Sequence, residues 1–301
     1  MKEIIYIGKE CGWKTAVFYL LYKIRLKCLL LTGAVAAGKR KTARLEKIYE
    51  LLAMQHLPQL NEQGRRYVVC PLPGMPAASV FLRPGSSDWK VYQQVFVLKE
   101  YQPVVDIYHQ FFNDAAHCII DCGANIGMAS IWLHRVFPEA RFIVVEPFAE
   151  NAQLAEKNFI STGLNQYKLL QGGVWSSDGL LQINRQFRDG KEWSIRLQPP
   201  LQGNGDIQAF SLPTILLQVE GWVDILKIDV EGAEQELFKD AATAANFLQR
   251  VKCLAIEIHD ELDIRQDIYR VLSDNHFFYF NTNELTIAIN RLCIHSPVIN
   301  K

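Results

Sequence analysis

The sequence predicts an α/β fold built on a doubly wound, mostly parallel sheet. From residue 117 onward, short apolar runs alternate with segments of helical character. The runs are continuously apolar rather than alternating, which indicates strands that are buried on both faces by helices. The last two runs are joined by a short turn and must therefore pair antiparallel.

Each element can be placed from the chain in order. The expected core strands are continuous apolar runs at 118–123, 141–147, 167–174, 224–230 and 251–259. The helices between and after them are expected at 125–137, 149–163, 211–218, 234–250 and 263–275. Alternating patterns at 179–186 and 192–200 predict an inserted hairpin, and the strands 276–282 and 284–291 close the chain. Gly163 is expected to end its helix.

The preceding third of the chain has a different character. Residues 1–63 are expected to be helical, and Pro and Gly residues around 71–76 mark a change. A strand at 78–84, a turn and a helix capped by Asp88 are expected next. We place a boundary near 66, between a basic helical extension (1–66) and a catalytic domain (67–301, core 117–292).

Charge is distributed unevenly in these 301 residues, although the formal net charge is zero. Residues 1–66 hold 13 Lys and Arg but 5 Asp and Glu, a net charge of +8, which the remainder balances. The zero net charge of the whole chain argues against a nucleic-acid binder. The basic excess in residues 1–66 favours either peripheral contact of the extension with an anionic membrane surface or an ordinary solvated helical pair. Four charges interrupt the apolar stretch 13–31, which argues against a membrane span.

The seven cysteines are scattered, odd in number and without a C-x-x-C pair. Cys118 and Cys253 lie inside apolar strands, where a thiol acts as a small hydrophobic group. We therefore expect a reducing, cytoplasmic environment, with neither a disulfide framework nor a zinc site.

The stretch "DCGANIG" (121–127) lies between a strand and a helix and predicts a cofactor site. Gly123 and Gly127 allow a tight turn, and Glu146 ends the next strand, where a carboxylate can accept both hydroxyls of a ribose. The G-x-G-x-x-G triplet of dinucleotide sites is missing, and Asp121 would repel a phosphate. An acid at this turn suits S-adenosylmethionine, which carries a sulfonium and no phosphate.

The end of the third core strand is a second candidate border of this site. Gly173, Val174 and Trp175 could meet the adenine ring there. Ordinary turn chemistry with a core Trp explains the same residues equally well.

Four stretches in order resemble the FkbM family of S-adenosylmethionine-dependent methyltransferases: "IIDCGANIGMAS", "VVEPFAENAQLAEKN", "ILKIDVEGAEQELF" and "LAIEIHDEL". The resemblance covers roughly residues 80–290. It implies a class I methyltransferase (Rossmann-like) fold with a seven-stranded sheet and methyl transfer to a hydroxyl of a glycan or natural-product acceptor. The residues expected to contact the cofactor are Asp121, Gly123, Ala124, Asn125, Gly127, Glu146, Pro147, Gly173, Val174 and Asp229.

The catalytic residues are expected at the ends of the fourth and fifth core strands. Asp229 is the first candidate for orienting the acceptor hydroxyl, and Glu231 could bind acceptor hydroxyls or a metal. Glu257 and His259 point to one face of a strand and could act as a base, or form half of a metal site with Asp229. Glu234 is expected to complement a helix dipole. No His-based ligand spacing accompanies these residues, so we expect no metal.

The acceptor itself is not specified by the sequence. Trp193 and Arg196 of the inserted hairpin are expected to border it, and Arg83, Ser87 and Asp88 to close the other side. Two other functions stay open: a catalytically silent scaffold with the same fold, and, less favoured, a dinucleotide-dependent oxidoreductase. The oligomeric state is also left open.

Overall fold

The computed structural model describes residues 57–184, 196–200, 205–282 and 284–294, together with Leu20 and Met54. The apolar stretch 13–31 lies outside this set except for Leu20, and so does Trp193. The chain divides into two compact units between Glu100 and Tyr101. Within the described residues, no helix is both long and apolar enough to cross a membrane.

The described part of the first unit is an antiparallel sheet followed by short helices. Its strands are β1 (Gln59–Glu62), β2 (Arg65–Leu72) and β3 (Met75–Leu82), in the order β1-β2-β3. The expected helix therefore does not reach residue 63, because Gln59–Glu62 pair with β2 instead. A boundary near 66 would cut β2, whereas the division by contacts comes after the helices α4 (Asp88–Tyr92) and η1 (Gln93–Val97).

Asp88 does not cap a helix, which corrects the expectation. Ser87 occupies the N-cap position, and Asp88 is the first helical residue. The Asp88 carboxylate is fully buried and accepts hydrogen bonds from Arg83: from its backbone N at 2.8 Å, Nε at 2.9 Å and Nη2 at 2.8 Å. A buried carboxylate needs such a partner, so this pair holds the β3–α4 turn within the first unit.

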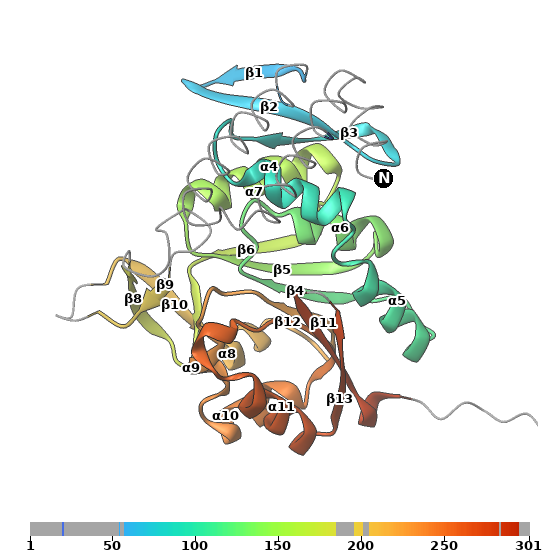
Figure 1. Cartoon of the computed structure of the whole chain (residues 1–301), viewed down its shortest axis with the longest axis vertical. Coiled ribbons are helices and arrows are strands. Elements are labelled where there is room, and N and C mark those ends of the chain that lie inside the picture. Colours follow the sequence, from blue (N-terminus) through green and yellow to red (C-terminus); the bar gives the residue numbers. More distant parts are fainter. Residues whose placement is uncertain are drawn as a thin grey trace, which may run out of the picture. The chain divides into compact units, whose positions relative to one another are not determined.

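The second unit is built on a seven-stranded sheet (Figure 1). Its strand order is β13-β14-β12-β11-β4-β5-β6, in which β14 is antiparallel to its neighbours β12 and β13. The strands are β4 (Cys118–Cys122), β5 (Arg141–Glu146), β6 (Tyr167–Gln171), β11 (Val223–Ile228), β12 (Val251–Glu257), β13 (Phe277–Thr282) and β14 (Leu285–Asn290). This is the class I methyltransferase fold, and it confirms the predicted doubly wound sheet with its terminal hairpin.

Helices cover both faces of this sheet, as its continuously apolar strands require. Figure 1 shows α5 (Gln102–Phe111), α6 (Met128–Val136) and α7 (Ala149–Thr162) on one face. On the other face lie α8 (Leu212–Leu216), α9 (Glu234–Phe238), α10 (Ala241–Leu248) and α11 (Arg265–Asp274), whose apolar side chains share one core with the sheet. The single helix expected over 234–250 is two helices, because the Asp240 side chain accepts a hydrogen bond from Thr243 N and starts α10.

The inserted hairpin belongs to a second, four-stranded sheet. Its order is β7-β10-β8-β9, made of β7 (Gly173–Trp175), β8 (Gly179–Asn184), β9 (Arg196–Gln198) and β10 (Ile207–Ser211). The antiparallel pairing of β8 with β9 confirms the predicted hairpin. The sequence reading missed β10, and the expected strand 167–174 is split between β6 and β7.

The parallel strands β5, β4, β11 and β12 end at one edge of the large sheet. Asp121, Glu146, Asp229 and Glu257 lie at or directly after these four ends, as predicted. Because a doubly wound sheet binds its ligands at the carboxyl edge, the topology brings all four acids to the binding edge.

Candidate active site

The glycine turn after β4 is shaped by close contact with the end of β11. Gly123 has φ +80°, and a Cβ placed there would lie 1.8 Å from the backbone oxygen of Asp229. Only glycine allows that approach. The predicted tight turn at Gly123 is therefore required by the protein's own backbone, and a contact of Gly123 with a ligand stays a prediction. The contact places the cofactor turn directly against Asp229.

The remainder of the turn is held against β5. The backbone N–H groups of Gly123 and Ala124 both donate to the Val145 carbonyl at 3.0 Å. Asn125 has φ +51°, and a Cβ on Gly127 (φ +84°) would lie 2.5 Å from the Phe159 ring. The turn is therefore fixed from both sides before any ligand binds.

A buried lysine, which the sequence reading did not select, neutralises the acid of this turn. Lys227 Nζ lies 3.0 Å from Asp121 Oδ1 and 3.6 Å from Asp229 Oδ2, and it donates to the Gly123 carbonyl at 2.7 Å. Burial alone would lower the pKa of Lys227, but Asp121 raises it above the ordinary value, so the ammonium stays charged.

Asp121 is fully buried and also accepts a hydrogen bond from Ser130 Oγ at 2.6 Å. Its charge is thus compensated within the protein. The geometry gives Asp121 the role of fixing the glycine turn through Lys227; direct contact of Asp121 with a cationic ligand stays a prediction.

Glu146, at the end of β5, is a carboxylate held by fixed donors. It accepts hydrogen bonds from Asn125 N at 2.8 Å, Phe148 N at 3.1 Å and Asn151 Nδ2 at 3.1 Å. Burial raises the pKa of Glu146 to about 7, against the lowering effect of these donors. Pro147 follows directly and leads into α7, and the sequence reading did not select Asn151. Glu146 is therefore oriented as a hydrogen-bond acceptor at the predicted ribose position.

The β7 residues have structural partners of their own. A Cβ on Gly173 would lie 2.3 Å from Leu197 Cδ1. Val174 belongs to the main apolar core, and Trp175 to a smaller cluster beneath the four-stranded sheet. Packing accounts for all three residues, and a contact with adenine stays a prediction.

The loop after β11 carries two of the predicted catalytic acids. Asp229 donates its N–H to the Cys122 carbonyl at 3.1 Å, and its side chain is 27% exposed. Glu231 has φ +48°, a left-handed conformation that is uncommon outside glycine, and its side chain is 26% exposed. Gly232, at φ +93°, continues this turn into α9. Both carboxylates are accessible at the strand ends.

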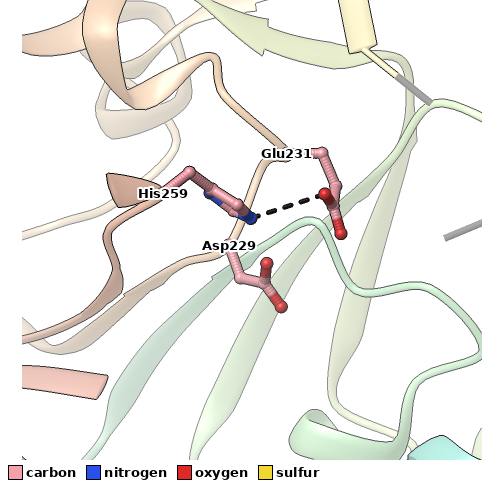
Figure 2. A group of neighbouring side chains, drawn as sticks. All are labelled: Asp229, Glu231 and His259. Carbon is pink, nitrogen blue, oxygen red and sulfur yellow. Dashed lines mark ion pairs between the residues drawn. The ribbon is translucent and has the colours of Figure 1, made fainter. Parts of the chain in front are cut away.

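His259 follows β12 and is clamped between two carboxylates. Its Nδ1 lies 2.9 Å from Glu234 Oε1, and its Nε2 lies 3.4 Å from Glu231 Oε2 (Figure 2). Burial opposes the charged ring, but the contacts with Glu231 and Glu234 raise the pKa of His259 to about 11. The ring therefore carries a proton at neutral pH when both carboxylates contact it, and a role of His259 as a base stays a prediction.

Glu234 has a role that the sequence reading did not assign. It lies in the first turn of α9, as expected, but it is fully buried, and its Oε1 also accepts the Val230 N–H at 3.3 Å. A buried carboxylate hydrogen-bonded to a His ring nitrogen fixes the orientation of that ring. In the sequence, the one feature that could have indicated this role of Glu234 is its position three residues after Glu231.

Glu257 completes the group. Its Oε1 lies 3.9 Å from His259 Nε2, and its side chain is 29% exposed. Burial and the charge of Asp229 raise the pKa of Glu257. The structure thus brings Asp229, Glu231, Glu257 and His259 together, next to the glycine turn.

Comparison with known proteins shows the family to which the chain belongs. The family model for the methyltransferase FkbM domain matches residues 121–279, more than half of the chain. The chain belongs to the FkbM methyltransferase family. The family match begins at the acid of the glycine turn and includes the whole strand-end group.

This FkbM methyltransferase also has a curated relative. Methyltransferase sdnD of Sordaria araneosa is 26% identical over 213 residues, which cover 57% of this chain and 81% of the relative.

Similar solved structures include two methyltransferases. The precorrin-6Y C5,15-methyltransferase of Geobacter metallireducens (TM-score 0.36, 12% identity) covers 62% of this chain and 86% of its own. The magnesium protoporphyrin IX methyltransferase of Synechocystis (TM-score 0.36, 15% identity) covers 66% and 83%. Both likenesses are distant, and the strand order of the large sheet is what defines the fold.

The cofactor of the FkbM methyltransferase is S-adenosylmethionine. The donor set of the site agrees with it. Glu146 offers an oriented acceptor for a ribose, and Asp229 offers a carboxylate beside the glycine turn. Lys227, the buried lysine at this edge, is already paired with Asp121 and the Gly123 carbonyl. Such a site suits a cationic nucleoside better than a dinucleotide phosphate.

Proposed function

We propose that this FkbM methyltransferase methylates a hydroxyl oxygen of a sugar, glycan or natural-product acceptor. The supporting observation is the group formed by Asp229, Glu231, Glu257 and His259, which lies where the cofactor turn contacts Asp229 through Gly123. Oxygen acceptors need partners for the hydroxyl proton, and this group is rich in carboxylate oxygens.

The cofactor, when bound, supplies an electrophilic methyl group on a sulfonium. The residues of the chain orient the acceptor toward it. Within this group, Asp229 is the residue whose backbone contacts the glycine turn, and Lys227 Nζ lies 3.6 Å from its Oδ2. In our proposal, Asp229 accepts the hydrogen bond of the acceptor hydroxyl and orients its oxygen. Holding two reactants in the correct geometry is itself a large part of such catalysis.

Glu231 and Glu257 are proposed to bind further hydroxyls of the acceptor. Their side chains are about as exposed as that of Asp229, and His259 lies between them. A polyhydroxylated acceptor would satisfy several carboxylates at once, which favours a sugar over an acceptor with one hydroxyl.

Peripheral membrane contact of the basic segment 1–66 is retained as a separate proposal, supported by its net charge of +8.

The test uses the full chain with a labelled methyl donor and a panel of hydroxylated acceptors. Asp229→Asn is expected to lose about 10²–10⁴-fold in transfer rate when the methyl donor is saturating. Asp274→Asn, an exposed acid at the end of α11, serves as the control and should transfer normally. Methyl transfer to nitrogen or carbon acceptors only, or full activity in Asp229→Asn, would contradict the proposal.

A further inference from the structure

Three side chains from two different loops converge beside the cofactor turn (Figure 2). Asp229 and Glu231 come from the loop after β11, and His259 from the end of β12. Each of them offers one ligand atom, and these atoms all lie within 4.8 Å of one another. Atoms this close can share one ion with small side-chain adjustments.

The donor types are those of a divalent cation site. Two carboxylates and one imidazole favour metals that accept both oxygen and nitrogen ligands, such as Mn²⁺, rather than the all-sulfur or sulfur-rich sites of structural zinc. Three protein ligands would leave further positions of an octahedral ion open. The Asp229 and Glu231 side chains are 27% and 26% exposed, whereas the Glu231 Oε2 atom that faces His259 is buried, so an ion there would be partly shielded from solvent.

Glu234 lies outside the three ligands and fixes the imidazole. Its Oε1 accepts both the Val230 N–H and the bond to His259 Nδ1 at 2.9 Å, which leaves Nε2 turned toward Glu231 and Asp229. Histidines that bind metals in proteins commonly pass their second ring nitrogen to a carboxylate in this way. Glu234 is fully buried, and its Oε2 has no hydrogen-bond partner among the described residues, so Oε1 alone holds both the ring and the loop backbone.

The local charge balance points the same way. Asp229, Glu231, Glu234 and Glu257 surround one imidazole, and the nearest lysine, Lys227, is shared with Asp121. Four carboxylates exceed the single positive charge of the protonated His259 ring, and a divalent ion bound at Nε2 would release the Nε2 proton while compensating the acids.

We propose that Asp229, Glu231 and His259 form a divalent cation site, with Glu234 as the residue that positions His259. The expectation from sequence was that no metal binds, because no ligand spacing is visible there; the ligands come instead from two strand ends that the sheet places side by side. The ion would ligate a hydroxyl oxygen of the acceptor, and this use rests on the proposed function.

The test measures Mn²⁺ binding to the full chain, in the absence of acceptor, from the loss of the free-ion signal in electron paramagnetic resonance. We expect one ion per chain. Glu231→Gln and Asp229→Asn, which keep the side-chain shape, should weaken binding at least about 10-fold, and Glu234→Gln by about 10–100-fold. Asp274→Asn should bind as the unchanged protein does. His259→Ala should also weaken Mn²⁺ binding. If this variant fails to fold, the isosteric variants Glu231→Gln and Asp229→Asn decide the result.

The proposed cation site would be refuted if the protein bound no Mn²⁺ at millimolar concentration, or if Glu231→Gln bound Mn²⁺ as tightly as Asp274→Asn. Calorimetry with S-adenosylhomocysteine and transfer assays with chelator separate this result from the proposed function. Transfer to hydroxyls that persists in chelator, without Mn²⁺ binding, rejects the metal site alone. Stoichiometric Mn²⁺ binding without any hydroxyl acceptor rejects the proposed function alone.

Discussion

Replacing Gly123 by Ala tests whether the glycine turn (121–127) and the loop after β11 are held as one unit. The added Cβ would lie 1.8 Å from the Asp229 backbone oxygen and 2.9 Å from its carbonyl carbon. Since both are backbone atoms, no side-chain rotation can relieve the overlap. The end of β11 would have to move away, and with it Asp229 and the 2.7 Å hydrogen bond from Lys227 to the Gly123 carbonyl.

The magnitude has two parts. An alanine at φ +80° costs about 1–2 kcal/mol in left-handed backbone energy. Overpacking of a tight contact costs about 1–3 kcal/mol more. The free energy of unfolding should therefore fall by about 2–5 kcal/mol.

Gly163→Ala is the matched control. Gly163 has φ +79°, but nothing lies within 4 Å of a Cβ built there. This variant should lose only the backbone part, about 1–2 kcal/mol. Any stabilisation from the less flexible unfolded chain affects both variants equally.

Urea unfolding of the two variants measures the difference, and calorimetry with S-adenosylhomocysteine measures its effect on the site. We expect Gly123→Ala to be the less stable by about 1–3 kcal/mol and to bind the cofactor product more weakly, with binding unchanged in Gly163→Ala. Equal losses of stability, or unchanged binding in Gly123→Ala, would refute the inference that the turn is fitted to the Asp229 backbone.

Three further predictions concern the acids and their partners. Burial raises the pKa of Glu146 to about 7, so the affinity for S-adenosylhomocysteine should increase as pH rises through 7 and the carboxyl group loses its proton, and then level off. Glu146→Gln should bind more weakly and without this pH dependence. A flat pH profile in the unchanged protein would contradict the prediction. Lys227→Met should lower the free energy of unfolding, measured with urea, by about 3–5 kcal/mol, because it leaves Asp121 buried without a cation. Adding Asp121→Asn should recover much of this loss. A double variant that is no more stable than Lys227→Met would argue against the ion pair. Asp224, at the amino ends of the strands, accepts hydrogen bonds from His117 N at 2.7 Å and Cys118 N at 2.9 Å. Asp224→Asn should therefore lower the free energy of unfolding by about 1–3 kcal/mol and leave the KM for the methyl donor unchanged. A raised KM would count against a purely structural role.

The sequence alone determined the architecture of the second unit. Continuous apolar runs need cover on both faces, and a short turn between the last two strands leaves only antiparallel pairing. The same pattern placed Asp121, Glu146, Asp229 and Glu257 at one edge, because parallel strands end on the same side. The choice of a cationic nucleoside also followed from the residue types at the glycine turn.

The first unit was less predictable. The strand β1 (Gln59–Glu62) has no apolar alternation of its own and exists through its pairing with β2. From the sequence, Asp88 is a typical helix N-cap, but in the structure its carboxylate accepts hydrogen bonds from Arg83, five residues earlier.

Only the tertiary structure decided which partner each acid has. Lys227 and Asp121 are far apart in sequence, and so are Glu234 and His259, yet each pair lies within 3.0 Å because adjacent strands bring their ends together. Whether a carboxylate is charge-compensated, orients a ring or faces the accessible edge depends on such contacts across strands. Periodicity along one chain carries no information about them, which is why the fold was predictable from local pattern and the division of roles among the acids was not.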